Sequence, residues 1–360
     1  TLMMCLGALG AAGVTWALVG YSLAFGAGGA YVGGAEYLGL AGVGLEAKGT
    51  IPHVLFMSYQ GTFAIVASVL IAGAVVERMR FGPYLAFIAL WTAFVYAPVA
   101  HWVWGGGWLS SLGVLDFAGG TVVHVNAGVS AVVAALAVGG RKDFGRQAVL
   151  PHNVPFVLLG TTLLYLGWFG FNAGSALAAN GTAGMSLLAT HLASCAAALV
   201  YVTMEWMRYG KPSALGIVTG SLAGLVAITP ACGLVGPLGA IAIGGIAAVA
   251  SFVAVNALKR RFGYDDTLDV FGVHGVSGLV GTLLTGVFAA RWLGGDRDLA
   301  SILDQVLAQV KAIAVTIAVS GVGTAAILFA IDRTLGLRAP AGDEATGLDL
   351  TEHGEAAYNY

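Results

Sequence analysis

Long apolar runs separated by short polar segments make up most of the chain. Crossing about 30 Å of hydrocarbon takes about 20 helical residues, and backbone in lipid must satisfy its own hydrogen bonds, so runs of this length are predicted to be transmembrane α-helices. The predicted spans are residues 2–26, 53–76, 83–104, 119–140, 154–178, 184–207, 213–231, 236–258, 272–292 and 303–332. The pattern therefore predicts an all-α, polytopic membrane protein with about ten spanning helices.

The polar segments between these runs carry basic residues unevenly. Assigning successive segments to alternate sides of a membrane places most Lys and Arg residues on one side: Arg78, Arg80, Arg141, Lys142, Arg146, Arg208, Lys211, Lys259, Arg260, Arg261, Arg333 and Arg338. The other side receives Lys48, Arg291 and Arg297. Because cytoplasmic segments carry an excess of Lys and Arg, both chain ends are predicted to face the cytoplasm, in a multi-pass protein of the cell inner membrane.

The two ends of the chain differ from the spans between them. After Arg338 the sequence is polar and acidic, so we expect a membrane domain over residues 1–334 and a cytoplasmic tail over residues 335–360. The apolar run after Thr1 lacks the basic start of a signal peptide. It is interpreted as a true span, in a chain that is expected to lack a preceding helix.

Composition supports the membrane assignment. The chain is 58% hydrophobic and only 9% charged, about a third of the charge of a soluble domain. Its 55 glycines suit closely packed membrane helices, where small residues let backbones approach. The three cysteines have neither a paired framework nor a metal-ligand spacing, so no disulfide is expected.

Two histidines lie inside apolar spans, and each follows an aspartate at the same spacing. Asp116 precedes His124 by eight residues, and Asp266 precedes His274 by eight. The two spans are five apart in order and so run in opposite directions, which is the pattern of an inverted five-helix repeat with its site near the midplane. Such a repeat plus a last long helix implies eleven spans, one of them before Thr1. Since a histidine in hydrocarbon indicates function by default, the pair is predicted to face each other in a conduction path.

Other interpretations of these residues were weighed. Two unrelated packing histidines are disfavoured by the repeated spacing. A metal site needs three or four ligands, and no cysteine or carboxylate lies within a turn of either histidine, so no metal is expected. Asp116 is interpreted chiefly as a helix N-terminal cap, with a secondary contribution to the field at the pore mouth, and Asp266 and Asp269 as caps at the inner end.

Aromatic residues gather near the predicted outer ends of several spans. Each one alone suits the membrane interface or helix packing. Together, with no acidic side chain inside the spans, they suggest a cation site made of ring faces and a hydroxyl, where each cation–π contact is worth about 0.5–2 kcal/mol. The set comprises Phe63, Trp104, Trp168, Phe169 and Phe171, followed within a turn by Ser175.

These segments resemble a known family over essentially the whole chain. The motifs that carry the resemblance are GYSLAFG, YQGTFA, ERMRF, HWVWGGGWL, DFAGGTVVHVNAG, PHNVPF, GWFGFNAGSA, TPACG, DVFGVHGVSGLVGTLLTG and GLDLTEHGEAAY. They resemble the ammonium transporter family, of the bacterial Amt type and related to Rhesus proteins. Among them, DFAGGTVVHVNAG is specific to that family. The family has eleven spans, and its first helix would precede Thr1.

The resemblance implies a path for the substrate. Trp104, Phe63 and Ser175 would form an outer recruitment site for ammonium, or for its analogue methylammonium. Phe63 and Phe171 would stack as a gate beneath that site. Ammonium would lose its proton near the gate.

Ammonia would then cross an apolar pore. His124 and His274 would line it, and the proton would follow by a separate route. Asp116 and Trp168 would have structural roles at the vestibule. Potassium resembles ammonium in size but carries no proton to give up, so an apolar pore would reject it.

The resemblance also implies partners. Family members are homotrimers with one pore per subunit. The tail, residues 335–360, is similar to a regulatory segment that packs under the neighbouring subunit and communicates with PII-type proteins. No cofactor and no nucleic acid are implied.

Three alternatives were considered. One is an ammonium sensor that signals through its tail. Another is a Rhesus-like neutral gas channel, which Trp104 disfavours because a recruiting ring face suits a cation. An intramembrane hydrolase is disfavoured because the chain lacks a GxSxG or HExxH setting, and the protein is not expected to be an enzyme.

Overall fold

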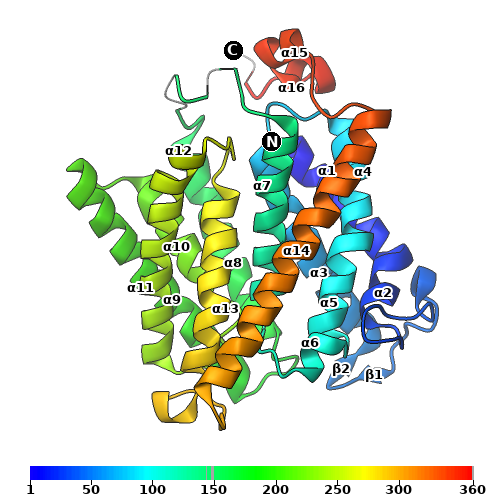
Figure 1. The fold of residues 1–360 in the computed structure, drawn as a ribbon, viewed down its shortest axis with the longest axis vertical. Helices are drawn as coiled ribbons and strands as arrows, with labels where there is room; N and C mark the ends of the chain where they lie inside the picture. The colour runs from blue at the N-terminus through cyan, green and yellow to red at the C-terminus, as the bar shows by residue number, and fades with distance from the viewer. Residues whose placement is uncertain (143, 147–149, 359–360) are drawn as a thin grey trace.

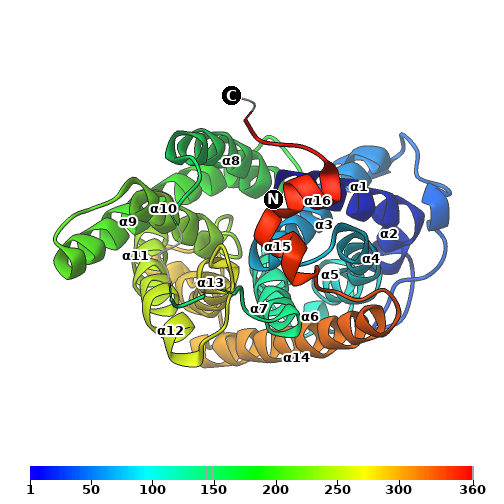
Figure 2. The same ribbon diagram turned by 90° about the horizontal axis from the view of Figure 1, so that it is seen from above.

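A computed structural model of the chain describes residues 1–142, 144–146 and 150–358. Long helices stand side by side with their axes roughly aligned, as Figure 1 shows. Seen from above in Figure 2, α1 to α7 lie on one side and α9 to α13 on the other. The helix α14 runs along one edge of both groups.

The first group contains the helices that precede residue 140. Its elements are α1 (Leu2–Thr15), η1 (Trp16–Gly20), α2 (Tyr21–Phe25), η2 (Leu38–Leu40), α3 (His53–Val75), α4 (Phe81–Trp91), η3 (Thr92–Tyr96), α5 (Ala97–Trp104), α6 (Trp108–Ser111), η4 (Gly120–Val125) and α7 (Asn126–Val138). Two short antiparallel strands lie between α2 and α3: β1 (Ala47–Lys48) and β2 (Ile51–Pro52).

The remaining helices complete the bundle and the C-terminal segment. They are α8 (Val154–Gly174), α9 (Gly181–Tyr209), α10 (Ala214–Ile228), α11 (Pro237–Val253), η5 (Ala254–Leu258), α12 (Lys259–Phe262), η6 (Phe271–Gly275), α13 (Val276–Phe288), η7 (Arg291–Leu293), α14 (Ile302–Thr334), α15 (Ala341–Thr346) and α16 (Leu348–His353).

The predicted spans correspond to helices of the structure. Within the described residues, nine helices are long and apolar enough to cross a membrane, and α10 is a shorter apolar helix. The helix α10 ends just before Thr229, which precedes Pro230, and a residue before proline disfavours helical backbone. The prediction of a helical, multi-pass membrane protein with about ten spans is confirmed.

Several helices begin at a polar side chain that caps them. Asn153, Asn180, Ser213 and Ser301 each accept a hydrogen bond from a backbone amide in the first turn of α8, α9, α10 and α14, respectively. Such caps satisfy amides that have no partner within the helix. Local sequence thus determines where these four helices start.

The two ends of the bundle carry different side chains. The basic end, uppermost in Figure 1, holds both described chain ends, the loops that follow α3 and α7, and the short helix α12. These segments contain Arg78, Arg141 and Lys259, respectively. The aromatic end is opposite, where α5 ends at Trp104 and α8 ends near Ser175. The helix with His124 starts at the aromatic end, and the helix with His274 starts at the basic end.

The long helix α14 is joined to both histidine-bearing helices by polar contacts. Gln309, which is fully buried, donates to the carbonyls of Leu115 at 2.6 Å and of Thr282 at 3.0 Å. Further along α14, Ser320 donates to Asn126 Oδ1 at 2.7 Å. These buried hydrogen bonds fix α14 across the two halves of the bundle.

The C-terminal segment folds back on the basic end of its own chain, next to α1 and α4 in Figure 2. Arg338 donates to the carbonyls of Val138 and Gly140, at 3.2 and 3.0 Å. Glu352 accepts from the amide of Phe81 at 2.7 Å, at the start of α4. The last two residues of the predicted tail, 359–360, lie outside the described residues.

Candidate functional site

A hollow of about 290 Å³ opens at the aromatic end of the bundle. It is lined by Phe25, Phe56, Gln60, Phe63, Val103, Trp104, Phe117, Ser175 and Leu177. The three residues predicted for the recruitment site, Trp104, Phe63 and Ser175, are thus brought together from α5, α3 and the end of α8. Trp104 Nε1 donates to the carbonyl of Asp116 at 2.8 Å, which fixes the indole in place.

Ser175 belongs to a small hydroxyl network. Its hydroxyl donates to the carbonyl of Phe171 at 2.9 Å. Tyr59 also donates to that carbonyl, at 2.6 Å, and its oxygen lies 3.1 Å from Ser175 Oγ. Because the carbonyl takes both hydroxyl hydrogens, Ser175 Oγ retains a lone pair for a donor in the hollow.

Tyr59 was missed by the sequence reasoning. It lies four residues before Phe63 on α3, and residues spaced by four share a helix face, so its spacing could have indicated a role. Phe56 was missed as well, although it lies on α3 two turns before Phe63. Phe25 was missed because it lies far in sequence from the other aromatic residues of the hollow.

Two phenylalanine rings, Phe63 of the hollow and Phe171, pack against each other. The ring centroids of Phe63 and Phe171 are 4.3 Å apart with 35° between the planes. Phe63 is 1% exposed and meets Trp104 edge-on at 5.5 Å. On its other side Phe171 packs against Trp168 at 5.6 Å and His124 at 6.2 Å. The ring pair therefore reaches from the hollow, which Phe63 lines, to His124.

His124 and His274 meet behind these rings. Their ring centroids are 5.4 Å apart, and Nδ1 of one lies 3.4 Å from Nδ1 of the other, a long hydrogen bond that needs one shared hydrogen. If Nδ1 of one ring donates, its Nε2 is an acceptor, and the Nε2 of the other ring is then a donor. Among the described residues, His124 Nε2 has no hydrogen-bond partner. The pair thus offers both kinds of group to a small solute.

Trp168 supports the histidine pair. Its ring is stacked on His124, with centroids 5.4 Å apart and 13° between the planes. Its Nε1 donates to Thr229 Oγ1 at 3.0 Å, and the side chain is 5% exposed. Trp168 therefore lies beside the predicted pore rather than in the hollow, whereas Phe169 packs against Tyr165 on the outer side of α8.

Both histidines lie in π-helical segments. His124 is in η4 and His274 is in η6, and each segment continues directly into an α-helix. The preceding spans of the two halves also contain π-helical segments, η3 and η5. The π-helix is rare and recurs at functional sites. The apolar pattern of the sequence contained no signal for it.

Glycines allow the two histidine-bearing helices to cross closely. A Cβ on Gly128 would collide with the backbone of Gly275, and a Cβ on Gly278 would meet His124 Cβ at 3.0 Å. Gly128 comes after His124 in its helix but contacts Gly275, which comes before Gly278 in the other helix. The two helices therefore run antiparallel. Small residues at this crossing bring the two imidazoles within reach of each other.

Asp116 caps the N-terminus of the helix that carries His124. Its carboxylate accepts from the amides of Gly119, Gly120 and Thr121 at 2.7, 2.6 and 2.8 Å, and from the Thr121 hydroxyl. The side chain is only 7% exposed. Burial raises the pKa of Asp116, and these hydrogen bonds oppose the rise. Its carbonyl, which accepts from Trp104, also joins the cap to the hollow.

The aspartates at the basic end differ from each other. Asp266 Oδ2 accepts from the amide of Phe271 at 2.7 Å, at the start of η6. Asp269 instead forms an ion pair with Lys259 of α12 at 2.7 Å, so its interpretation as a cap is corrected. Its backbone is left-handed, with φ 58°, whereas a capping residue normally has extended backbone.

The carboxyl group of Asp266 has a raised pKa. Its Oδ1 is buried and has no hydrogen-bond partner among the described residues. Burial raises the pKa of Asp266 to about 6, and the hydrogen bond from Phe271 opposes the rise. Protonation removes the cost of holding an incompletely bonded carboxylate away from water.

We expect Asp266→Asn to remove a pH dependence of stability. The folded-state pKa is about 6 and exceeds the unfolded value of about 4, so wild-type stability falls as pH rises from about 4 to about 6. Asn keeps the acceptor for Phe271 and carries no charge. The variant should match wild type at pH 4 and be up to about 3 kcal/mol more stable at pH 7.

Thermal unfolding in detergent between pH 4 and pH 8 measures this difference. Asp296→Asn, at an exposed aspartate of the aromatic end, is the matched control and should follow wild type. A variant at Asp266 that also follows wild type at every pH contradicts the prediction.

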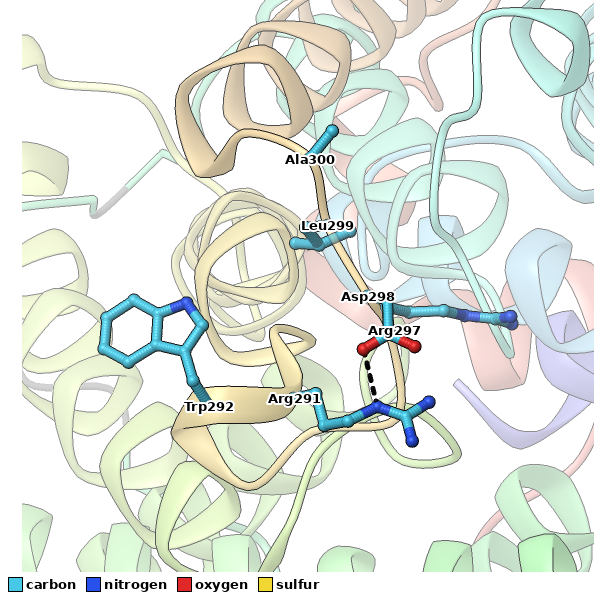
Figure 3. A pocket seen from close by; sticks show the side chains of 6 residues that line it. All are labelled: Arg291, Trp292, Arg297, Asp298, Leu299 and Ala300. Carbon is cyan, nitrogen blue, oxygen red and sulfur yellow. Dashed lines mark ion pairs between the residues drawn. The ribbon is translucent and has the colours of Figure 1, made fainter.

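A second hollow, of about 430 Å³, is shown in Figure 3. It lies in the loop between α13 and α14, where Arg291 pairs with Asp298 at 2.7 Å. Trp292 points away from this ion pair. None of the predicted site residues lines it.

Within the described part of the chain, no group of three or more His, Cys, Asp or Glu side chains is placed to hold a metal ion. The three cysteines, Cys5, Cys195 and Cys232, are all unpaired.

The helical bundle and its interior define a multi-pass membrane protein in which a buried histidine pair lies behind an aromatic hollow. The chain belongs to the Ammonium Transporter Family, whose model matches residues 1–358. It is 45% identical to an ammonium transporter of Bacillus subtilis over 99% of this chain and 90% of that protein. It is 47% identical to an ammonium transporter of Aquifex aeolicus over 100% of this chain and 85% of that protein.

Solved structures show the same fold. Mep2 of Candida albicans has a TM-score of 0.88 at 37% identity, over 94% of this chain and 78% of that one. A structure named as a sensor Amt protein has a TM-score of 0.89 at 30% identity, over 97% of this chain and 88% of that one. The resemblance inferred from the sequence motifs is confirmed.

Proposed function

We propose that this protein transports ammonium nitrogen across a membrane. Ammonium binds in the hollow, where Trp104 and Phe63 offer ring faces and Ser175 offers a lone pair. It loses its proton near the gate formed by Phe63 and Phe171. Ammonia then passes His124 and His274. The observation that carries this proposal is the order of the parts: aromatic hollow, tilted pair of phenylalanine rings, histidine pair.

Selectivity follows from the chemistry of the interior. A bare cation is costly in an apolar pore, so an ion that cannot become neutral is stopped at the gate. Ammonium can give up a proton, at about 1.4 kcal/mol for each unit between its pKa and the local pH. Potassium cannot. The histidines then supply an acceptor and a donor to ammonia, which apolar walls do not.

The proposal includes the orientation of the protein in the membrane and the relation between its two halves. The excess of Lys and Arg at the basic end supports a cytoplasmic location for that end, in the cell inner membrane. The opposite directions of the histidine-bearing helices and the paired π-helical segments, η3 with η5 and η4 with η6, support an inverted repeat.

Assembly as a homotrimer is part of the proposal. The exposed face of α8 carries the apolar side chains Phe156, Leu159 and Leu163, and next to it Tyr165 bonds exposed His191 at 2.8 Å. A polar pair on the outside of a spanning helix is costly in lipid, which supports its being covered by a second copy.

We further propose that residues 335–360 form a cytoplasmic regulatory tail that a PII-type protein contacts. The hydrogen bonds of Arg338 to the end of α7 support this role, because α7 continues the helical segment that contains His124. A contact that displaced the tail would therefore act on a pore helix.

Uptake by proteoliposomes tests the proposed function. Purified protein should give saturable methylammonium uptake that ammonium competes with and potassium does not. Currents on a solid-supported membrane after an ammonium jump distinguish two modes of transport. A current that scales with ammonium means that charge moves, whereas uptake without current means a neutral, Rhesus-like channel.

An ammonium sensor is the second candidate, because one structural neighbour is named as a sensor. A sensor would bind ammonium in the hollow without appreciable flux. Binding of ammonium to the purified protein, without uptake by the same preparation in liposomes, would favour this candidate over a transporter.

We expect Trp104→Leu to raise the KM for methylammonium by about twofold to thirtyfold, because the variant loses one cation–π contact of about 0.5–2 kcal/mol. Initial uptake rates over a range of concentrations measure the KM. Trp108→Leu is the matched control, because this tryptophan is half-buried and packs against Trp102 outside the hollow. The KM of the Trp108→Leu variant should stay close to that of the wild-type protein. An unchanged KM in Trp104→Leu argues against the recruitment site.

A further inference from the structure

A lysine side chain occupies a cage of four aromatic rings at the aromatic end. Lys48 Nζ lies 4.8 Å from the ring centroid of Tyr37, 5.3 Å from those of Tyr21 and Phe56, and 5.8 Å from that of Phe25. It also donates to the Tyr21 hydroxyl at 3.2 Å. Four ring faces around one ammonium group form a cation site, and here the cation belongs to the chain itself.

This aromatic cage shares two rings with the hollow. Phe25 and Phe56 line the hollow and also contact Lys48. A cation–π contact places a cation about 5–6 Å from a ring centroid, so cations on opposite sides of a shared ring are about 10 Å apart. The Lys48 ammonium is thus a fixed positive charge beside the recruitment site.

Nearby acidic groups do not neutralise this charge directly. Among the described residues, Lys48 forms no ion pair. Burial lowers the pKa of Lys48 and the charge of Glu36 opposes that effect, while the carboxylate of Glu36 accepts from the amide of Ala27 at 2.8 Å. His53 bonds the same Tyr21 hydroxyl, at 2.6 Å, and carries no negative charge. The positive charge therefore remains incompletely compensated.

We propose that Lys48 determines the affinity of the hollow for ammonium, by repelling the bound cation across the shared rings of Phe25 and Phe56. The inference rests on the proposed function. Two unit charges about 10 Å apart change binding by about twofold in a water-like dielectric and about fifteenfold at an effective dielectric constant of 20. A weaker outer site releases its cation more readily toward the gate.

The test is methylammonium uptake by proteoliposomes that contain Lys48→Met, which keeps an unbranched apolar chain and removes the charge. The KM is expected to fall by about twofold to fifteenfold. Lys48→Gln should lower it in the same direction, and Lys48→Arg should keep it nearer to wild type. Added sodium chloride should narrow the difference between wild type and Lys48→Met, because salt screens charge.

Lys311→Met is the matched control, since it removes an exposed lysine from α14 and should leave the KM unchanged. If Lys48 only anchors its loop, Met and Arg variants lose thermal stability and uptake alike while the KM does not fall, and the inference is overturned. Wild-type uptake with an equal KM in Lys48→Met overturns this inference alone. Absence of saturable uptake by the wild-type protein overturns the proposed function and this inference with it.

Discussion

His124→Ala is expected to reduce methylammonium uptake at least about tenfold. The substitution removes the partner of His274 Nδ1 and leaves a buried nitrogen unpaired, at a cost of about 1–3 kcal/mol. It also removes the ring between Trp168 and His274 and replaces a donor or acceptor along the path with a methyl group. Uptake rates in proteoliposomes at equal protein content measure the effect.

His152→Ala is the matched control for this prediction. His152 is an exposed histidine in the loop before α8, where its ring stacks on Tyr358, away from the histidine pair. Its uptake should be similar to wild type. The assignment of His124 to the path fails if His124→Ala keeps both the wild-type uptake rate and the exclusion of potassium.

Asp116→Ala is expected to destabilise the fold by at least about 3 kcal/mol, because hydrogen bonds to a charged group contribute about 1.5–3 kcal/mol each and the variant leaves the buried amides of Gly119, Gly120 and Thr121 without their acceptor. Thermal unfolding in detergent should show a fall in Tm of at least about 5 °C. Uptake should fall with the amount of folded protein.

Asp116→Asn separates structure from charge. An amide keeps one oxygen for Gly119 and Gly120, which share Oδ1, but it turns an NH2 group toward the Thr121 amide, where two donors meet. We therefore expect a loss of stability in this variant as well. Normal stability together with a raised KM would mean that Asp116 acts through its field at the hollow instead.

Much of the fold could be predicted from local patterns. Apolar runs long enough to cross a bilayer predicted the helices, since a spanning backbone in lipid has few alternatives. Capping residues such as Asn153 and Ser213 mark where helices begin. The breaks in helical geometry were not predictable in this way. The apolar spacing of the sequence carries no signal for the π-helical segments η3, η4, η5 and η6.

The candidate site was only partly predictable. Trp104, Phe63 and Ser175, which were predicted to form one site, do line a single hollow. Lys48 was assigned only to a polar loop, and nothing in its neighbours in sequence indicated four aromatic rings around it. Those rings come from α2, the loop after it and α3.

The sequence by itself determined the membrane class, the approximate spans and the pairing of two aspartate and histidine units, because hydropathy and spacing are properties of contiguous residues. The tertiary structure alone decided which side chains share a surface. It stacked Trp168 on His124, packed Phe171 against Phe63 of the hollow, and set Lys48 beside that hollow. Such contacts join segments far apart in the chain, and their geometry depends on how the helices pack, with small residues allowing the closest crossings.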